Sequence, residues 1–327
     1  MIAANNLVIQ TRQLTKQFDD YAAVSDVSLQ VREGEVYGLI GPNGAGKTTL
    51  IRLLAMAEDP TVGDIFIDGK PVIRAQPNPD IKERIGYLPD DFPLYNDLTV
   101  QQYLEYFGQL YYLKPAELHQ RIGDVLGLVQ LENKRNSIIS SLSRGMKQRL
   151  SLARTVIHRP RLLLLDEPVS GLDPIARVEY CKTIKRLQQD GITILISSHI
   201  LSDLEDFCTH IGIMEKGRLV ESGQIDSLYK KEGQRLLIGV LGERANANFS
   251  PIEIYLQEHP LVENYERIER GRLGETGKLG VTFLGTEEDA AELLRVLVYE
   301  GVRISEFHYT QETLEDIFMR LGYRQTA

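Results

Sequence analysis

Residues Gly41-Pro-Asn-Gly-Ala-Gly46-Lys47-Thr48 decide how this chain folds, because they follow the P-loop pattern of a glycine, four residues, Gly-Lys and a Ser or Thr. In such a loop, small residues let backbone N–H groups curl around a β-phosphate, and the next helix points its positive end at that anion. We expect Lys47 to reach the β- and γ-phosphates and the Thr48 hydroxyl to face Mg²⁺. The predicted nucleotide site comprises Gly41, Pro42, Asn43, Gly44, Ala45, Gly46, Lys47, Thr48 and Thr49.

The segments that flank this loop support the prediction. Residues 35–40 have the character of a buried strand, and residues 48–55 have helical apolar spacing. A Gly-rich loop without a ligand is the alternative, and it requires neither flank. Strands and helices then alternate, which predicts an α/β domain with a largely parallel sheet. The later elements are expected at 161–165 (strand), 174–189 (helix), 192–197 (strand) and 200–208 (helix).

Between these two halves, residues from about 99 to 158 contain no convincing strand. Helical patterns cover 100–110, 115–127 and 143–158. We therefore expect an all-helical subdomain inserted into the α/β domain at about residues 99–158.

The polar stretch 230–234 predicts a boundary between a domain of residues 1–230 and one of residues 235–327. Beyond it, the expected order is strand, helix, strand, strand, helix, strand and helix. That order predicts a small α+β domain of the ferredoxin-like type. The expected elements are 236–241, 251–258, 262–267, 278–284, 287–300, 303–309 and 313–321.

A second group of polar residues completes the predicted site. The stretch Leu162-Leu-Leu-Leu165-Asp166-Glu167 has the character of a buried strand that ends in two carboxylates. Asp166 is placed to hold the Mg²⁺ shell, as a Walker-B Asp does. Glu167 is placed to orient an attacking water or to accept its proton. An apolar strand ending in Asp-Glu is common by itself, but together with a P-loop it indicates nucleotide hydrolysis.

With Leu142-Ser-Arg-Gly-Met-Lys-Gln148, these motifs resemble the ATP-binding subunit of an ABC transporter over residues 7–230. The family's signature loop begins Leu-Ser-Gly-Gly-Gln, and this chain keeps the serine and the second glycine. From the residues alone, Ser143 is a good helix N-cap, so a simple capped helix is the alternative. The resemblance implies a P-loop NTPase fold, ATP and Mg²⁺ as cofactors, and a signature loop that acts on a second subunit's ATP. That loop would comprise Ser143, Arg144, Gly145 and Met146.

The resemblance assigns further positions one by one. His199 matches the switch histidine that contacts the γ-phosphate and the attacking water. Phe18 matches an aromatic residue that stacks on adenine, although a phenylalanine in an edge strand also suits core packing. Asp90 stands where the family usually has Gln, and its carboxylate could hold a metal-bound water beside Thr48 and Asp166. The D-loop, which lies across the family's dimer interface, would comprise Ser170, Gly171, Leu172 and Asp173.

Three features resemble one branch of the family, the daunorubicin-resistance type of exporter with separate ATPase and membrane subunits. They are the signature variant Ser-Arg-Gly-Met-Lys-Gln, the acidic Asp90, and the ending Thr313-Leu-Glu-Asp-Ile-Phe-Met-Arg-Leu321. The last stretch is also an ordinary amphipathic helix pattern. The chain carries one set of motifs, so the resemblance implies a second ATPase subunit, either an identical chain or a paralogue.

Composition limits the partners. The 327 residues include 37 Lys and Arg against 46 Asp and Glu, a net charge of −9, and residues 240–327 alone carry −7. Nucleic-acid binding needs a basic footprint, so we expect no nucleic-acid partner. The longest apolar run, 236–242, is far shorter than the roughly 18 residues of a membrane span. The resemblance implies a membrane partner, which must then be another polypeptide, so we expect a separate transmembrane subunit that holds this chain at the cytoplasmic face of the membrane.

Two other functions deserve comparison. A soluble ABC ATPase acting on a ribosome or a nucleic-acid machine usually has two ATPase modules or a long coiled-coil insertion, and this chain shows neither. A regulatory subunit without catalysis would typically lack the carboxylate at Glu167, which is present. The favoured interpretation is an ATP-hydrolysing subunit that powers transport, most naturally export.

Overall fold

The computed structural model describes residues 6–200, 204, 207–225, 234–241, 250–269 and 276–310. The chain divides into two compact units, whose described residues lie within 6–225 and 234–310, and each is described by itself. Most of the expected helix at 200–208 and of the expected boundary at 230–234 lies outside the described residues. The expected final helix at 313–321 lies outside them entirely.

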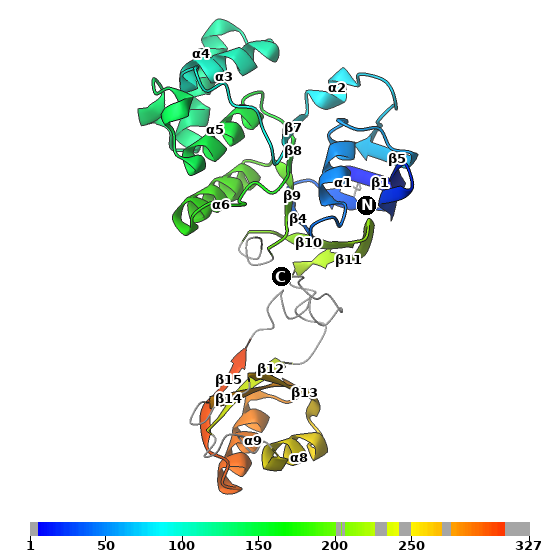
Figure 1. The fold of residues 1–327 in the computed structure, drawn as a ribbon, viewed down its shortest axis with the longest axis vertical. Helices are drawn as coiled ribbons and strands as arrows, with labels where there is room; N and C mark the ends of the chain where they lie inside the picture. The colour runs from blue at the N-terminus through cyan, green and yellow to red at the C-terminus, as the bar shows by residue number, and fades with distance from the viewer. Residues whose placement is uncertain are drawn as a thin grey trace, which may run out of the picture. The chain divides into compact units, whose positions relative to one another are not determined.

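The first unit is built on a six-stranded sheet in the order β11-β10-β4-β9-β8-β7 (Figure 1). Every neighbouring pair is parallel except β10 and β11. The three strands β4, β8 and β9 are buried along their whole length, as expected for parallel strands covered on both faces. The α/β prediction is thus confirmed. The bounds are β4 Val36–Ile40, β7 Ile85–Leu88, β8 Leu162–Leu165, β9 Thr193–Ser198, β10 His210–Glu215 and β11 Arg218–Gln224.

A smaller antiparallel sheet packs with the parallel sheet around helix α1, Lys47–Leu54. Its order is β2-β1-β5-β6, and β3 also pairs with β1. Side chains of β1, α1, β8 and β9 belong to one buried apolar cluster, which holds α1 between the two sheets. The bounds are β1 Leu7–Phe18, β2 Tyr21–Val27, β3 Gln30–Arg32, β5 Val62–Ile67 and β6 Lys70–Pro71.

Helices occupy the chain between β7 and β8. Helices α3, α4 and α5 pack on one another and gather on one side of the sheet, at the upper left of Figure 1. Thr99 begins α3 with a capping box that it forms with Gln102. The bounds are α3 Val100–Leu110, α4 Pro115–Leu128 and α5 Arg144–Val156, with short 3₁₀ turns at Glu132–Lys134 and Ile139–Ser141. Two further helices of this unit are α2, Pro79–Lys82, and α6, Pro174–Gln189.

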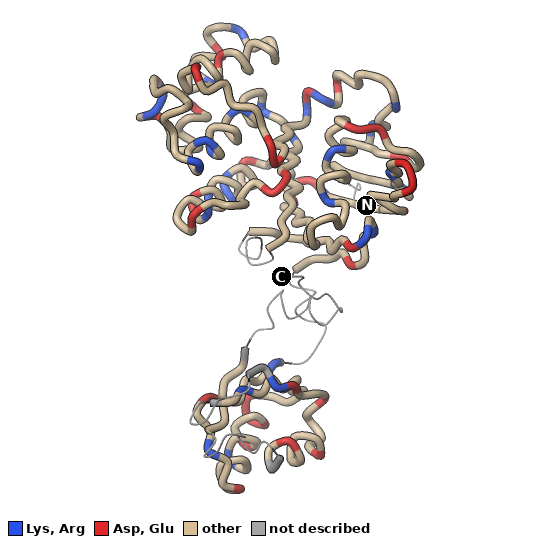
Figure 2. Tube along the Cα trace, in the orientation of Figure 1, with Lys and Arg blue, Asp and Glu red and all other residues tan. Residues whose placement is uncertain are grey.

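In its described residues, the second unit is an antiparallel sheet with two helices. Its strand order is β13-β14-β12-β15. Alternate residues of β12 (Leu236, Ile238 and Val240) are buried with side chains of both helices. Acidic positions are spread over the unit rather than gathered at one place (Figure 2). The bounds are β12 Gln234–Leu241, α8 Ser250–Glu258, β13 Val262–Glu269, β14 Thr276–Phe283, α9 Glu287–Tyr299 and β15 Ile304–Thr310.

In the part of the chain that the structure describes, no helix combines the length and the apolar character needed to cross a bilayer.

Candidate functional site

The predicted phosphate-binding loop connects the buried strand β4 to helix α1, and two of its glycines are sterically required. A Cβ atom added at Gly41 would lie 2.3 Å from the Met214 carbonyl oxygen, and one added at Gly46 would lie 2.2 Å from the Ala23 carbonyl oxygen. Gly46 also has φ of +101° at the N-cap of α1, a conformation that favours glycine. The loop therefore fits tightly between neighbouring strands, and its shape depends on these glycines.

Lys47 lies inside this loop with its side chain buried. Its Nζ donates to the carbonyl oxygen of Gly41 at 2.7 Å and to that of Pro42 at 3.3 Å. The same ammonium lies 3.4 Å from Glu167 Oε1. A buried cation at the mouth of a glycine loop is suited to bind an anion, since a phosphate can take the place of these oxygens.

Asp166 lies at the end of β8 and meets the start of α1. Its Oδ1 accepts hydrogen bonds from Thr48 Oγ1 at 3.2 Å and from Ser197 Oγ at 2.8 Å. Its Oδ2 is buried and has no hydrogen-bond partner among the described residues. Burial raises the pKa of this carboxyl, and the nearby Glu167 and Asp90 act in the same direction. An orphaned carboxylate oxygen beside a hydroxyl suits a hard cation, so the residues present fit Mg²⁺.

Glu167 follows Asp166 and holds an unusual backbone conformation, with φ of +47°. Its N–H donates to Ser197 Oγ at 2.9 Å, and its Oε2 lies 2.7 Å from His199 Nδ1. Ser197 thus links both carboxylate residues at the carboxyl end of β9. Because β8 and β9 are parallel neighbours, their ends bring Asp166, Glu167 and His199 together.

Glu167 lines one cavity of about 250 Å³ together with residues of the phosphate-binding loop and Asp90, whereas Asp166 and His199 are not among its lining residues. Of the residues proposed from the family resemblance, Asp90 therefore lies beside the predicted metal site. Phe18 does not line this cavity, and its exposed ring lies 4.8 Å from Lys16 Nζ. The complete lining is Tyr21, Ala23, Asn43, Gly44, Ala45, Gly46, Lys47, Thr48, Thr49, Asp90 and Glu167.

Sequence reasoning missed two lining residues, Ala23 and Tyr21, and of these two Tyr21 brings a polar side chain to the cavity. Its hydroxyl donates to the Gly44 carbonyl oxygen at 3.1 Å, and its ring is 55% exposed. Tyr21 pairs with Phe18 across the tight turn between β1 and β2. An aromatic residue on each side of a two-residue turn was the available signal, because a hairpin places both side chains at one end of the sheet.

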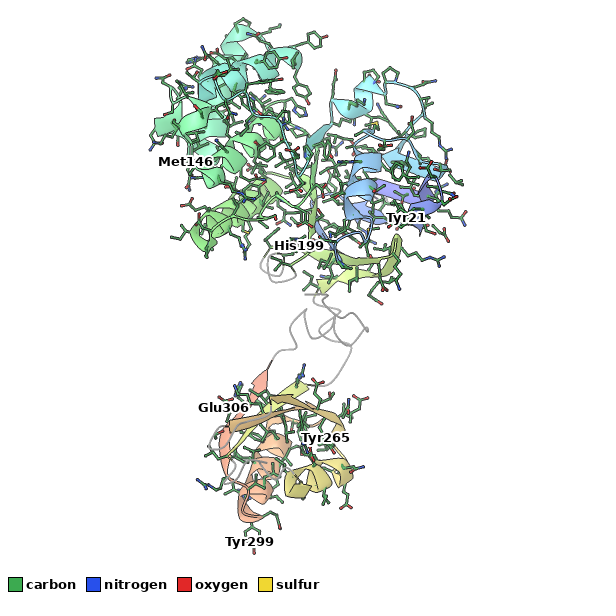
Figure 3. All side chains as sticks on the ribbon, in the orientation of Figure 1. Tyr21, Met146, His199, Tyr265, Tyr299 and Glu306 are labelled. Atoms are coloured by element: carbon green, nitrogen blue, oxygen red, sulfur yellow. The ribbon has the colours of Figure 1, made fainter. Side chains whose placement is uncertain are left out.

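The signature residues lie on a different part of the unit. Ser143 caps α5 by accepting a hydrogen bond from the Met146 N–H at 3.3 Å, and Asp173 caps α6 by accepting one from the Ala176 N–H at 2.9 Å. None of residues 143–146 lines the cavity. Figure 3 shows Met146 well apart from both His199 and Tyr21. Within one chain, the signature loop and the phosphate-binding loop therefore do not form a common site.

Comparison with known proteins gives matches along the whole chain. The family model described as "ABC transporter" matches residues 24–170. A Nod factor export ATP-binding protein I from Cupriavidus pinatubonensis is 32% identical over 324 residues, which cover 99% of this chain and 93% of that protein. The bacitracin transport ATP-binding protein BcrA of Bacillus licheniformis is 34% identical over 323 residues, covering 96% of this chain and 97% of that protein.

Solved structures match about two thirds of the chain. A structure described as the ATP-binding subunit of an ABC transporter superposes with a TM-score of 0.61 at 30% identity, covering 68% of this chain and 92% of that one. The structure of cbiO1 from Clostridium perfringens, described as part of an ABC transporter complex, gives a TM-score of 0.64 at 26% identity. It covers 69% of this chain and 92% of its own.

Proposed function

This chain belongs to the ABC transporter family as an ATP-binding and ATP-hydrolysing subunit, and we propose that it powers export through a membrane subunit that is a separate polypeptide. The observation that carries this proposal is the similarity, over nearly the whole chain, to proteins named for Nod factor export and bacitracin transport. We assign it to the daunorubicin-resistance type of exporter. The signature variant at residues 142–148 and the acidic Asp90 support this finer assignment.

We assign the catalytic work to the residues around the cavity. Lys47, released from the loop carbonyls, would bind the β- and γ-phosphates. Thr48 and Asp166 would hold Mg²⁺, with Asp90 as a further ligand through water, and the cation would neutralise charge on the phosphates. Glu167 would accept the proton of the attacking water, and His199, 2.7 Å away, would orient that carboxylate.

Because the signature loop lies away from the cavity within one chain, we infer that a second ATPase subunit takes part. We propose that Ser143 and Gly145 act on ATP held by a second subunit, across an interface that includes the D-loop, residues 170–173. The exposed side chains of Ile175 and Val178, next to that loop on α6, are consistent with a covered surface.

Light scattering of the Glu167→Gln protein tests this assembly. We expect a monomer without ATP and a dimer with ATP, because slow hydrolysis would preserve the ATP that joins the subunits. Adding Gly145→Asp should abolish the dimer because it places an anion beside a phosphate, whereas Gly145→Ala, whose Cβ meets Ala176 in the same way, should retain it. The proposal would be contradicted if the Glu167→Gln protein stayed monomeric at saturating ATP. If a paralogue copurifies, the same result would have to hold for the mixture of the two proteins.

Copurification tests the membrane partner. We propose that the complex lies at the cytoplasmic face of the membrane. The affinity-tagged chain, extracted from membranes with mild detergent, should therefore copurify with a polypeptide that has several membrane spans. We propose that this chain has no nucleic-acid partner. Recovery of ribosomes or nucleic acid instead of a membrane protein would favour the alternative of a soluble machine. The relatives named above give that alternative no support.

We infer that the second unit is an accessory, ferredoxin-like domain that assists assembly or regulation. Its element order, β12-α8-β13-β14-α9-β15, supports this assignment. Its described residues contain no group of three or more His, Cys, Asp or Glu residues that could hold a metal ion. We therefore assign no catalysis to it.

A further inference from the structure

Arg144 stands where the family's signature loop has a glycine, and its guanidinium lies on the D-loop of its own chain. Its Nη2 donates to the Ser170 carbonyl oxygen at 3.1 Å. A Cβ atom added at Gly171 would lie 2.4 Å from Nη2, 2.5 Å from Cζ and 2.6 Å from Nη1 of this arginine. The guanidinium therefore rests directly on the glycine backbone, and a side chain at position 171 would displace it.

The D-loop that Arg144 contacts begins three residues after Glu167, the proposed general base. The Ser170 N–H donates to the Glu167 carbonyl oxygen at 3.1 Å, which closes a tight turn over residues 167–170. Glu167 has φ of +47°, a region that costs a residue with a side chain about 1 kcal/mol or more. Such a conformation persists only where neighbouring groups hold it. Arg144 is bonded to the far end of the turn that holds Glu167.

Other contacts keep α5 and α6 together independently of Arg144. Gly145 packs so closely on α6 that an added Cβ would lie 2.9 Å from Ala176 Cβ. Further along the helices, Arg149 Nη1 lies 3.3 Å from Glu179 Oε2. Removing the Arg144 side chain should therefore leave the packing of the two helices intact and release only the turn.

We propose that Arg144 is a positioning residue for ATP hydrolysis: it holds the turn 167–170 of its own chain and, through it, the carboxylate of Glu167. This inference rests on the proposed role of Glu167 as general base. It differs from the action of the signature loop on a second subunit's ATP, because the contact lies within one chain. The two roles predict different outcomes when Arg144 and Gly171 are changed together.

Hydrogen exchange of the full chain without nucleotide tests the contact itself. In Arg144→Ala, amides of residues 168–173 should exchange about tenfold faster than in the wild type. Loss of a hydrogen bond from a charged donor should raise the population of the open turn by about this factor. Amides of the phosphate-binding loop, residues 41–49, should be unchanged. Unchanged exchange at 168–173 would overturn the inference, whatever the activity of the protein.

Steady-state kinetics test the consequence. Arg144→Ala should lower kcat about tenfold and leave the Kd for ATP unchanged, because the turn, not the phosphate loop, is released. Gly171→Ala should have the same effect, since its methyl group displaces the guanidinium. Gly191→Ala is the matched control: Gly191 has φ of +87° but no heavy atom within 4 Å of an added Cβ. Because Gly171 has φ of +65°, alanine at either position meets similar backbone strain, but only at position 171 does it meet the Arg144 guanidinium.

The double variant decides between the two roles. If Arg144 acts through Gly171 and Ser170, the double variant should be no slower than either single variant. If the reductions in kcat caused by the two single variants multiply in the double variant, Arg144 acts on the ATP of the second subunit and the inference is wrong. A wild-type chain that neither binds nor hydrolyses ATP would instead contradict the proposed function, and the exchange measurement would still decide the contact.

Discussion

The imidazole Nδ1 of His199 lies 2.7 Å from Oε2 of Glu167, while the ammonium of Lys47 lies 3.4 Å from the other oxygen of the same carboxylate. The proposed general base is thus held between a histidine and the cation that would bind phosphate. Phosphate binding would draw Lys47 away from Glu167, and His199 would remain as the partner that fixes the carboxylate.

Replacing the base should slow hydrolysis without preventing binding. Glu167→Gln keeps the shape of the side chain and removes its capacity to accept a proton. We expect kcat to fall by roughly 10²–10⁴-fold, the usual contribution of a general base, with the Kd for ATP little changed. Phosphate-release assays and equilibrium binding give the two quantities. Turnover at the wild-type rate would show that another group is the base.

Removing the imidazole should produce a smaller loss of the same kind. His199→Ala leaves Glu167 without the partner that orients it, so we expect kcat to fall by about 10-fold or more while ATP still binds. His119→Ala, which changes an exposed residue of α4, is the control and should hydrolyse normally. Equal rates for the two variants would remove His199 from the catalytic group.

Removing the loop cation should act on binding itself. Lys47→Ala deletes the buried ammonium that lies 2.7 Å from the Gly41 carbonyl oxygen, and with it the charge that would meet the phosphates. We expect ATP affinity to fall by about 10-fold or more, since a hydrogen bond between charged groups contributes roughly 1.5–3 kcal/mol. Calorimetric titration measures this, with the exposed Lys70→Ala as control. Tight ATP binding by Lys47→Ala would count against the phosphate-binding role.

Stability should depend on His158 in mild acid. Burial lowers the pKa of His158 to about 4. The ring stacks on Tyr111 with centroids 3.8 Å apart, and its Nε2 lies 3.1 Å from the Ile85 carbonyl oxygen. Its Nδ1 is buried without a hydrogen-bond partner in the described structure, so protonation would leave an unpaired buried N–H. The neutral ring is therefore the form that fits the fold.

The sign of this effect follows from proton binding. An unfolded histidine has a pKa of about 6.5 and takes up its proton first as the pH falls. His158 thus stabilises the fold fully above about pH 6.5, and this contribution is lost as the pH falls through 6.5 toward 4. Between pH 7 and 4.5, the free energy of unfolding should fall about 2–3 kcal/mol further in the wild type than in His158→Phe. Urea denaturation measures it, and His119→Phe should behave as the wild type does.

Much of the site was predictable because its signals are local. The P-loop spacing at Gly41–Thr48 and the apolar strand before Asp166 and Glu167 depend on neighbours in the chain, and short-range turn and strand chemistry determines both. The same reasoning predicted the α/β class, since a buried parallel strand is a continuous apolar run. The adenine-stacking role of Phe18 remains a prediction, as does the metal role of Asp90.

Only the tertiary structure decided which distant residues meet. The sheet places β4 between β10 and β9, and the parallel pairing of β8 and β9 brings Glu167 to His199. The hairpin of β1 and β2 brings Tyr21 to the loop, and the packing of α5 on α6 brings Arg144 to Ser170. Local sequence determines where strands, helices and turns form, because their hydrogen bonds and periodicity are short-range. Contacts between distant segments instead depend on how the buried faces of all the elements pack together, and no single segment specifies that arrangement.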